Sequence, residues 1–318
     1  MLKNITYKVV IIDDEEDFYE DYTEIIEKKL NAEGYLLKPQ RFEELSELTD
    51  NDISDVDLFL VDLKFGNEDK GQEFIAKIRE RYFTDILFYS SDSKSIIEKR
   101  KSGEYQGVFF AVRDEHRSEI KSIINKLIDK MLMRSNSPIS TRGTVLSCVA
   151  EIDNLIKAKI VHLLQKLSAD QRKDLENQCI KIFRDSYKGT FGKAKEFFGV
   201  DFHKGLVELG ELTANIGTFD IEKLSKDIDL TNSNKNLRIL TYLYKKLVGK
   251  DETYNTVKKI EMLLSDRNIL AHVEEEVLES GEYGFKKPKG DGYLVLSRAK
   301  CIELRKCIAE YAEAVNLI

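Results

Sequence analysis

The sequence predicts an α/β domain built on a parallel sheet, followed by an all-α helical bundle with an inserted β-hairpin. Short apolar runs separated by amphipathic segments fill residues 1–115, which is typical of buried parallel strands with crossover helices. From residue 145 onward, apolar residues recur every three or four positions, the period of amphipathic helices. Strand character returns only at residues 283–296, around two glycines that suit a hairpin turn.

Each apolar run of the first part ends on a polar residue. The runs are Val9–Ile12 before Asp13 and Asp14, Leu58–Val61 before Asp62, Ile86–Tyr89 before Ser90, and Val108–Val112 before Arg113. Parallel sheets bind ligands at the carboxyl ends of their strands, so we expect these polar side chains to meet at one edge. An acidic turn after the first run also suits the N-terminus of the next helix, whose dipole favours carboxylates.

These residues and their spacing resemble the receiver domain of bacterial response regulators over residues 1–134. The resemblance implies a flavodoxin-like fold with a five-stranded parallel sheet. It also implies Mg²⁺ as cofactor, held by Asp13, Asp14 and Asp62, and a sensor histidine kinase or another phosphodonor as partner. Asp62 is then the phosphorylated nucleophile, because the metal neutralises the oxygens of the incoming phosphoryl group. Ser90 is expected to bind a phosphoryl oxygen as a switch residue.

Two positions depart from the receiver pattern. The family has a lysine, usually followed by proline, where this chain has Arg113, a planar fork instead of a point charge. Lys64 stands two positions after the nucleophile, where it either replaces the missing lysine or occupies the space of the metal. Two interpretations stay open: a receiver phosphorylated on Asp62, with Lys64, Ser90 and Arg113 as switch residues, and a pseudo-receiver that works without phosphate.

Composition agrees with two globular domains. The chain has 318 residues, 42% of them apolar and 34% charged. It has no apolar run near the roughly 18 residues that span a bilayer, and its start leads into a predicted strand instead of a signal peptide. We therefore expect a cytoplasmic protein without a membrane partner. The four cysteines show no Cys-x-x-Cys spacing, which argues against a zinc knuckle or a disulfide framework.

Charge is divided unevenly along the chain. Residues 1–134 carry 21 Lys and Arg against 30 Asp and Glu, a net charge of −9, so the whole-chain value of −7 leaves +2 for the remainder. Affinity for nucleic acid follows the number of phosphates that a protein neutralises. A near-neutral second half argues against a strongly basic domain that binds duplex nucleic acid, but permits a smaller local basic patch.

Residues 135–143 are polar and contain a proline, which predicts a linker between a domain at 1–134 and a domain at 144–318. The second domain begins with a long amphipathic helix. Its apolar positions are Val145, Val149, Ile152, Ile156, Ile160, Leu163 and Leu167. Further helices are expected near residues 170–187, 204–215, 221–230, 235–247, 252–270 and 298–317.

A short polar string marks the end of the penultimate predicted helix. Arg267 is followed by Asn268 and, five positions after the arginine, by His272. This string resembles the signature of the HEPN family of helical-bundle proteins, many of which are ribonucleases, and residues 190–192 resemble their Thr-x-Gly turn. Residues five apart on a helix diverge by about 140°. In the family the site is commonly completed across a dimer, so a homodimer is expected.

The resemblance implies metal-independent cleavage of RNA, with Arg267, Asn268 and His272 as catalytic residues. Histidine takes or gives a proton near neutral pH, arginine stabilises the charge of a phosphorane, and asparagine orients either one. A run of three glutamates after His272 opposes RNA. The alternative is a non-catalytic partner-binding or dimerisation module, in which His272 only ends a helix.

Two groups of lysines near aromatic residues are candidate RNA contacts, because aromatics stack bases while cations neutralise phosphates. The first is Lys188, Lys193 and Lys195 among Phe191, Phe197 and Phe198; the second is Lys286, Lys287 and Lys289 near Phe285 and Tyr293. The sequence therefore predicts a two-component response regulator whose receiver controls a HEPN-like RNA endonuclease. The non-catalytic module behind a receiver or pseudo-receiver is the alternative.

Overall fold

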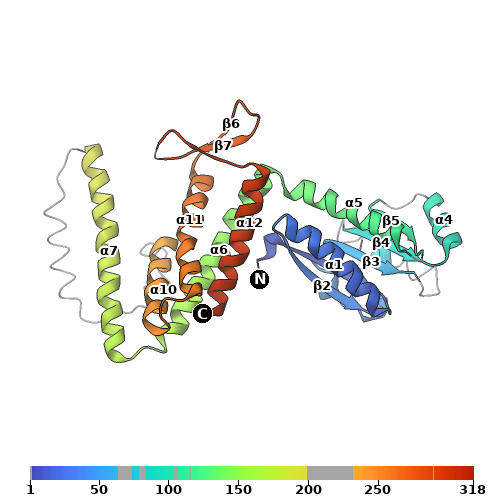
Figure 1. Cartoon of the computed structure of the whole chain (residues 1–318), viewed down its shortest axis with the longest axis horizontal. Coiled ribbons are helices and arrows are strands. Elements are labelled where there is room, and N and C mark those ends of the chain that lie inside the picture. Colours follow the sequence, from blue (N-terminus) through green and yellow to red (C-terminus); the bar gives the residue numbers. More distant parts are fainter. Residues whose placement is uncertain are drawn as a thin grey trace. The chain divides into compact units, whose positions relative to one another are not determined.

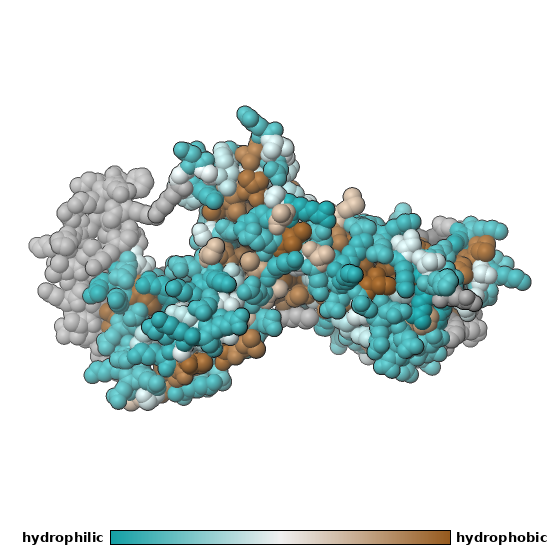
Figure 2. All heavy atoms as spheres, in the orientation of Figure 1, coloured by the Kyte–Doolittle hydropathy of each residue, from teal (hydrophilic) through white to brown (hydrophobic). Residues whose placement is uncertain are grey.

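The computed structural model describes residues 2–63, 74–78, 84–102, 106–114, 116–198, 232–288 and 290–318 (Figure 1). Contacts divide the chain into two compact units. Unit 1 comprises Met1–Thr144 with Leu296–Lys306, and unit 2 comprises Val145–Val295 with Cys307–Ile318. Within the described ranges, no helix has the length and apolar character needed to cross a membrane. On the face drawn in Figure 2, hydrophilic residues predominate and hydrophobic residues form small separate areas.

Unit 1 contains a five-stranded parallel sheet, as the sequence predicts. Its strands are β1 (Thr6–Ile12), β2 (Leu36–Phe42), β3 (Leu58–Asp62), β4 (Asp85–Ser90) and β5 (Val108–Val112). They lie in the order β2-β1-β3-β4-β5, and all neighbours pair in parallel. This order is that of flavodoxin-like folds and is compatible with a receiver domain.

Helices cover both faces of this sheet. On one face, α1 (Glu16–Ala32) and α5 (Ser118–Ser135) contact each other (Figure 1). They bury apolar residues at helical spacing, namely Phe18, Tyr22, Ile26 and Leu30 of α1 and Ile120, Ile124 and Leu127 of α5. On the other face, α2 (Asp50–Ile53) and the helical residues 74–78 pack on alternate residues of the central strands. Helix α4 (Ser93–Ser102) contacts β4 and β5.

A half-buried carboxylate, Asp57, precedes β3 at the edge of the sheet opposite to the polar strand ends. The backbone N–H of Lys8 donates to Oδ2 of Asp57 at 2.8 Å, and burial raises the pKa of Asp57 to about 6. The folded protein therefore holds this proton more tightly than the unfolded chain. Stability contributed by the protonated group is lost as the pH rises from about 4 to about 6.

We expect the Asp57→Asn variant to gain stability over wild type across this pH range, by on the order of 1 kcal/mol. An asparagine oxygen still accepts the Lys8 N–H and carries no charge to bury. Urea unfolding of both proteins at several pH values from 4 to 7 measures the difference. A difference in free energy of unfolding that stays constant over this range would contradict the assignment.

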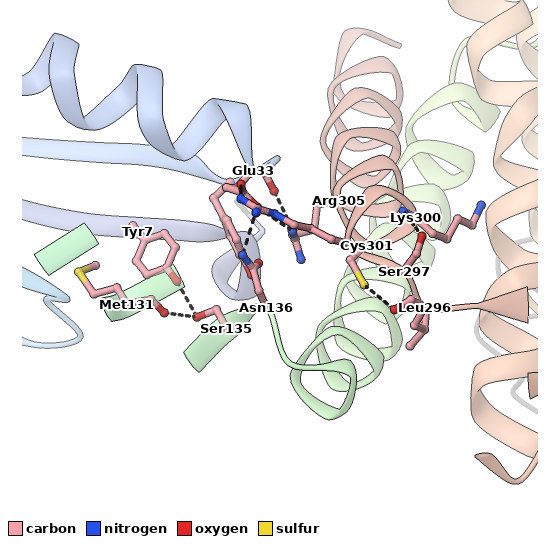
Figure 3. A network of polar contacts seen from close by, with 12 residues as sticks. Tyr7, Glu33, Met131, Ser135, Asn136, Leu296, Ser297, Lys300, Cys301 and Arg305 are labelled. Atoms are coloured by element: carbon pink, nitrogen blue, oxygen red, sulfur yellow. Dashed lines mark hydrogen bonds and ion pairs between the residues drawn. The ribbon is translucent and has the colours of Figure 1, made fainter. Parts of the chain in front are cut away.

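The turn between α1 and β2 docks on the beginning of α12 (Arg298–Leu317), inside unit 1 (Figure 3). Arg305 is 1% exposed, its Nε donates to the Glu33 carbonyl at 2.8 Å, and its guanidinium carbon lies 4.4 Å from the Tyr35 ring centroid. The Arg298 guanidinium pairs with the Glu33 carboxylate and holds the pKa of that group below its usual range. Residues near the C-terminus of the chain are therefore part of the first unit.

The helices of the second half are α6 (Pro138–Leu164), α7 (Ala169–Phe198), α10 (Ser233–Leu247), α11 (Glu252–His272) and the rest of α12. Every apolar position predicted for α6 and the following turn is buried, from Val145 to Leu167. The helix begins earlier than expected, at Pro138, because proline suits the first helical position. Of the residues 135–143 expected as linker, only Asn136 and Ser137 lie outside α5 and α6. The helices expected at 204–215 and 221–230 lie outside the described residues.

A small antiparallel sheet follows α11. It consists of β6 (Glu275–Val277), β7 (Tyr283–Lys286) and β8 (Tyr293–Val295), in that order. The predicted hairpin corresponds to β7 and β8, and β6 is a third strand that the sequence analysis did not predict. Its three residues are exposed, so they carry no apolar pattern that would indicate a strand.

Candidate functional site

Three carboxylates meet at the carboxyl edge of the parallel sheet. Asp13 follows β1 and Asp62 ends β3. These neighbouring strands flank the point at which the strand order of the sheet reverses. One ligand oxygen each of Asp13, Asp14 and Asp62 lies within 4.8 Å of the others. Asp13 and Asp62 are 0% and 1% exposed, whereas Asp14 is exposed. Buried carboxylates need a compensating cation or hydrogen bonds, so this cluster could hold a metal ion.

Both oxygens of the Asp13 carboxylate accept hydrogen bonds. The backbone N–H of Glu15 donates to Oδ1 at 2.9 Å, and the Tyr89 hydroxyl donates to Oδ2 at 2.6 Å. Burial and the neighbouring Asp13 raise the pKa of Tyr89 well above its usual value, so the phenol keeps the proton it donates. The Tyr89 ring lies edge-on to Tyr22 of α1, with ring centroids 5.7 Å apart. These contacts fix the orientation of Asp13.

Arg113 lies directly on the predicted phosphoacceptor. Its Nη1 is 2.7 Å from Oδ2 of Asp62, and its Nη2 is 2.8 Å from a carboxylate oxygen of Glu15. The arginine side chain is 8% exposed, and its guanidinium carbon lies 3.4 Å from the centroid of the Phe18 ring. The guanidinium carbon of Arg117 lies at the same distance from that centroid. Two guanidinium groups at this distance occupy opposite faces of the ring, so Phe18 holds Arg113 in place.

Ser90 lies beside these groups through the register of the sheet. Asp62 pairs with Tyr89, and Ser90, the next residue of β4, is 6% exposed. The Arg113 N–H donates to the Ser90 carbonyl at 2.8 Å. The Ser90 Oγ accepts the Asp92 N–H at 3.2 Å. The strand ends therefore bring a hydroxyl, a guanidinium and the three carboxylates to one edge of the sheet. Lys64, the other predicted switch residue, lies outside the described residues.

Sequence reasoning missed the side chains that hold Arg113 and Asp13 in place. Tyr89 is the one hydroxyl-bearing residue of an apolar run, and that position was the available signal. The pairs Phe18 with Tyr22 and Arg113 with Arg117 each have a spacing of four. Only the fold shows that these pairs meet.

The second predicted site lies at the end of α11, in unit 2. Arg267 is half-buried, and its Nη2 donates to the Ser233 hydroxyl at 2.9 Å at the start of α10. Asn268 and His272 are exposed and lie four positions apart, on one face of the helix. Because α11 is unbroken to His272, Arg267 and His272 point in different directions by about 140°. One chain therefore presents the three residues without bringing arginine and histidine together.

The hairpin offers less to RNA than its sequence indicates. Phe285 is 0% exposed and belongs to the core of unit 2, so it cannot stack on a base. The Tyr293 hydroxyl donates to a carboxylate oxygen of Glu276 at 2.9 Å. Lys286 and Lys287 are exposed. Lys289 and the side chains of residues 187–198, which include Lys188, Lys193 and Lys195, lie outside the described part of the chain.

Comparisons with protein-family models, with curated proteins and with solved structures found no match to this chain. The two sites are therefore interpreted from their own chemistry. The first combines three acidic oxygens with a fixed cation and a hydroxyl, a set suited to a metal ion and a phosphoryl group. The second presents an exposed imidazole and amide beside a helix end.

Proposed function

We propose that unit 1 is a receiver that is phosphorylated on Asp62, and that its phosphorylation controls a HEPN-like, RNA-cleaving helical domain. One observation carries the first part of this proposal. The carboxylates of Asp13, Asp14 and Asp62 lie within 4.8 Å of one another, with Arg113 bonded to Asp62. Phosphorylation then acts as a local electrostatic change that biases a two-state element.

The donor set fits Mg²⁺. All three groups are carboxylates, the hard oxygen donors that this ion prefers, and Asp14 is exposed, so water and a phosphodonor have access. Asp13, Asp14 and Asp62 would hold the ion. When bound, Mg²⁺ supplies positive charge that offsets the repulsion between the carboxylates and a phosphoryl group.

The chain's own residues supply the remaining chemistry. An oxygen of Asp62 attacks the phosphorus of the donor, and the bond from phosphorus to the donor's nitrogen or oxygen breaks. The leaving group departs with the electron pair and takes a proton from solvent. Ser90 donates its hydroxyl to a phosphoryl oxygen, and Arg113 donates its N–H groups from the place where Phe18 and Glu15 hold it.

Exposure to a small phosphodonor such as acetyl phosphate, with Mg²⁺, tests the acceptor. The intact mass of the wild-type protein should increase by one phosphoryl group, and Asp62→Asn should show no increase. Asp92→Asn is the matched control, because Asp92 is an exposed carboxylate two residues after Ser90. A wild-type mass that does not change would contradict the proposal and support the pseudo-receiver.

Tyr89→Phe is expected to raise the affinity for Mg²⁺ by about three- to tenfold, because it frees Oδ2 of Asp13 from a hydrogen bond. Calorimetric titration with MgCl₂ measures the change. Tyr22→Phe is the control. Within the described ranges its hydroxyl has no hydrogen-bond partner, so its loss should leave Mg²⁺ affinity unchanged. Equal effects of the two variants would show that the Tyr89 hydroxyl does not compete with the metal.

For the output, we propose that two copies of the chain combine Arg267 of one with Asn268 and His272 of the other. Exposure of Asn268 and His272 supports this, as does the failure of one chain to bring Arg267 to His272. Histidine would remove the proton of the RNA 2′-hydroxyl, whose oxygen attacks the adjacent phosphorus. Arginine would stabilise the phosphorane until the 5′-oxygen leaves and takes up a proton.

Cleavage of single-stranded RNA in the presence of EDTA tests this output. Arg267→Ala and His272→Ala should each lose cleavage, whereas His162→Ala, at an exposed histidine of α6, should retain it. Mixing the two inactive variants should restore about one quarter of wild-type activity, because half of the dimers are mixed and each has one intact site. Full activity in the single variants would refute the catalytic assignment.

A non-catalytic binding module is the second candidate for the helical domain. Two observations favour it: Ser233 already engages Arg267, and the exposed Glu274, Glu275 and Glu276 place negative charge next to His272. In that case the wild-type protein cleaves no RNA at any protein concentration, with or without a phosphodonor.

A further inference from the structure

A pocket of about 250 Å³ lies between helices α7, α10 and α11 of unit 2. Its lining combines cations with aromatic rings: Arg238 and Lys245 of α10, Lys258 of α11, Tyr242 of α10 and Tyr254 of α11, with Glu261 as the one carboxylate among the lining residues that the structure describes. None of these residues belongs to the strand-end site or to the predicted Arg267 string.

The cations at this pocket are available to a ligand. Lys245 and Lys258 are exposed and form no ion pair within the residues that the structure describes. Arg238 is held only loosely, with its Nη2 3.7 Å from a carboxylate oxygen of Asp185, and both side chains are more than 40% exposed. Among the described residues, these three cations outnumber Glu261 in the lining and the neighbouring Asp185, so an excess of positive charge remains in a chain whose net charge is −7. Such a local excess favours an anionic ligand, above all phosphate.

The aromatic residues indicate the second half of the ligand. Tyr242 and Tyr254 are half-buried, so each ring exposes part of its surface at the pocket. Leu237, 4% exposed, adds an apolar side chain to the lining. Rings beside cations are the arrangement that binds nucleotides, with the base stacked and the phosphate neutralised. The volume is slightly below the roughly 300–1,000 Å³ of pockets for larger ligands, which matches one nucleotide better than a dinucleotide.

The same stripe of α11 leads from this pocket to the predicted catalytic residues. Tyr254, Lys258 and Glu261 continue at steps of three and four to Ser265, Asn268 and His272. Tyr254 and His272 are 18 residues apart, or five turns at about 3.6 residues per turn, and so face the same direction. From Glu261 to His272 the distance along the axis is roughly 17 Å. The residues of this stripe are all exposed from Lys258 to His272.

We propose that this pocket binds one nucleotide of single-stranded RNA, with its phosphate at Arg238, Lys245 and Lys258 and its base on Tyr242 or Tyr254. The strand would then follow the α11 stripe toward Asn268 and His272. This inference deepens the proposed function, and its link to cleavage rests on that function. A free mononucleotide has the same base and phosphate, so the experiment includes both sources.

Binding is measured in the His272→Ala protein, so that no RNA is cut, by titration with AMP, with inorganic phosphate and with a five-nucleotide single-stranded RNA. Lys258→Gln and Lys245→Gln should each weaken RNA binding by about tenfold and reduce its salt dependence. Of Tyr242→Leu and Tyr254→Leu, the variant that removes the stacking ring should weaken binding of RNA or AMP by about tenfold and leave phosphate binding unaffected. Lys259→Gln is the matched control, because Lys259 is exposed on α11 beside Lys258 and does not line the pocket.

These measurements distinguish RNA from a free nucleotide as the ligand, and they test the pocket separately from cleavage. Binding of RNA alone that depends on Lys258 supports the proposal, and such binding of AMP alone supports the pocket with a free nucleotide as ligand. No binding of any probe overturns the inference, as do equal effects of Lys258→Gln and Lys259→Gln. Pocket-dependent binding in a protein that never cleaves RNA would refute the proposed cleavage and keep this inference. RNA cleavage by the protein with His272 intact that is insensitive to Lys258→Gln would refute this inference and keep the proposed cleavage.

Discussion

Replacing Gly34 by alanine is expected to lower the free energy of unfolding by about 3 kcal/mol. Gly34 has a φ of +79°, in the left-handed region that alanine adopts at a cost. A Cβ at this position would lie 3.0 Å from the Ile302 carbonyl oxygen and 3.0 Å from the Arg305 Cβ. Neither atom is the free end of a flexible side chain. The turn between α1 and β2 would therefore move away from α12 and loosen the bond from Arg305 to the Glu33 carbonyl.

Gly281→Ala is the control for this prediction. Gly281 has the same φ of +79°, but a Cβ there would meet no described atom within 4 Å. It should cost only the backbone strain, about 1 kcal/mol. Urea unfolding followed by circular dichroism measures both variants. If both variants lose the same free energy of unfolding, the contact between α12 and the α1–β2 turn contributes nothing to stability. That result would contradict the assignment of Leu296–Lys306 to unit 1.

Replacing Arg113 by alanine is expected to lower the free energy of unfolding by about 3 kcal/mol without Mg²⁺, because the buried Asp62 loses the ion pair with Arg113. The variant also leaves Asp13, Asp14 and Asp62 close together with less positive charge beside them. Mg²⁺ should therefore restore much of the loss. The increase in Tm on adding millimolar MgCl₂ should be larger for the variant than for wild type.

Arg117→Ala separates this effect from the loss of contact with the Phe18 ring. Arg117 lies on the same ring, but its ion-pair partner is Asp21, whose side chain is 48% exposed. Its removal should cost about 1 kcal/mol or less, and the response to Mg²⁺ should remain that of wild type. A Mg²⁺ response of Arg113→Ala that equals the wild-type response would show that Arg113 does not offset the charge of the cluster formed by Asp13, Asp14 and Asp62.

The sequence predicts the central strands of unit 1 well, because each is buried on both faces and reads as an apolar run. Strand β2 has no such run. It is an edge strand that is half-buried along most of its length, and it contains Pro39, which a central strand would not accept. Strand β6 is not predicted from the sequence either, because its residues are exposed and form no apolar run. Contacts formed by distant segments, such as Glu33 with Arg305, have no local signature at all.

At the strand-end site, the sequence predicts which polar groups meet but not their orientation. Asp13, Asp62, Ser90 and Arg113 follow from the rule that polar residues after parallel strands share an edge. Whether a guanidinium reaches Asp62 depends on Phe18, which lies on α1, far from Arg113 in sequence. At the end of α11, the unbroken helix confirms that Arg267 and His272 diverge, and their catalytic role stays a prediction.

Binding of beryllofluoride, which mimics a phosphoryl group on a carboxylate, tests the central claim most directly. Fluorine NMR of the wild-type protein with Mg²⁺, Be²⁺ and fluoride should show a bound signal at one equivalent, and this signal should disappear on removal of Mg²⁺ with EDTA. The Asp62→Ala protein should show none. A bound signal of equal intensity in Asp62→Ala, or no bound signal in a folded wild-type protein, would contradict phosphorylation of Asp62 as the input to this protein.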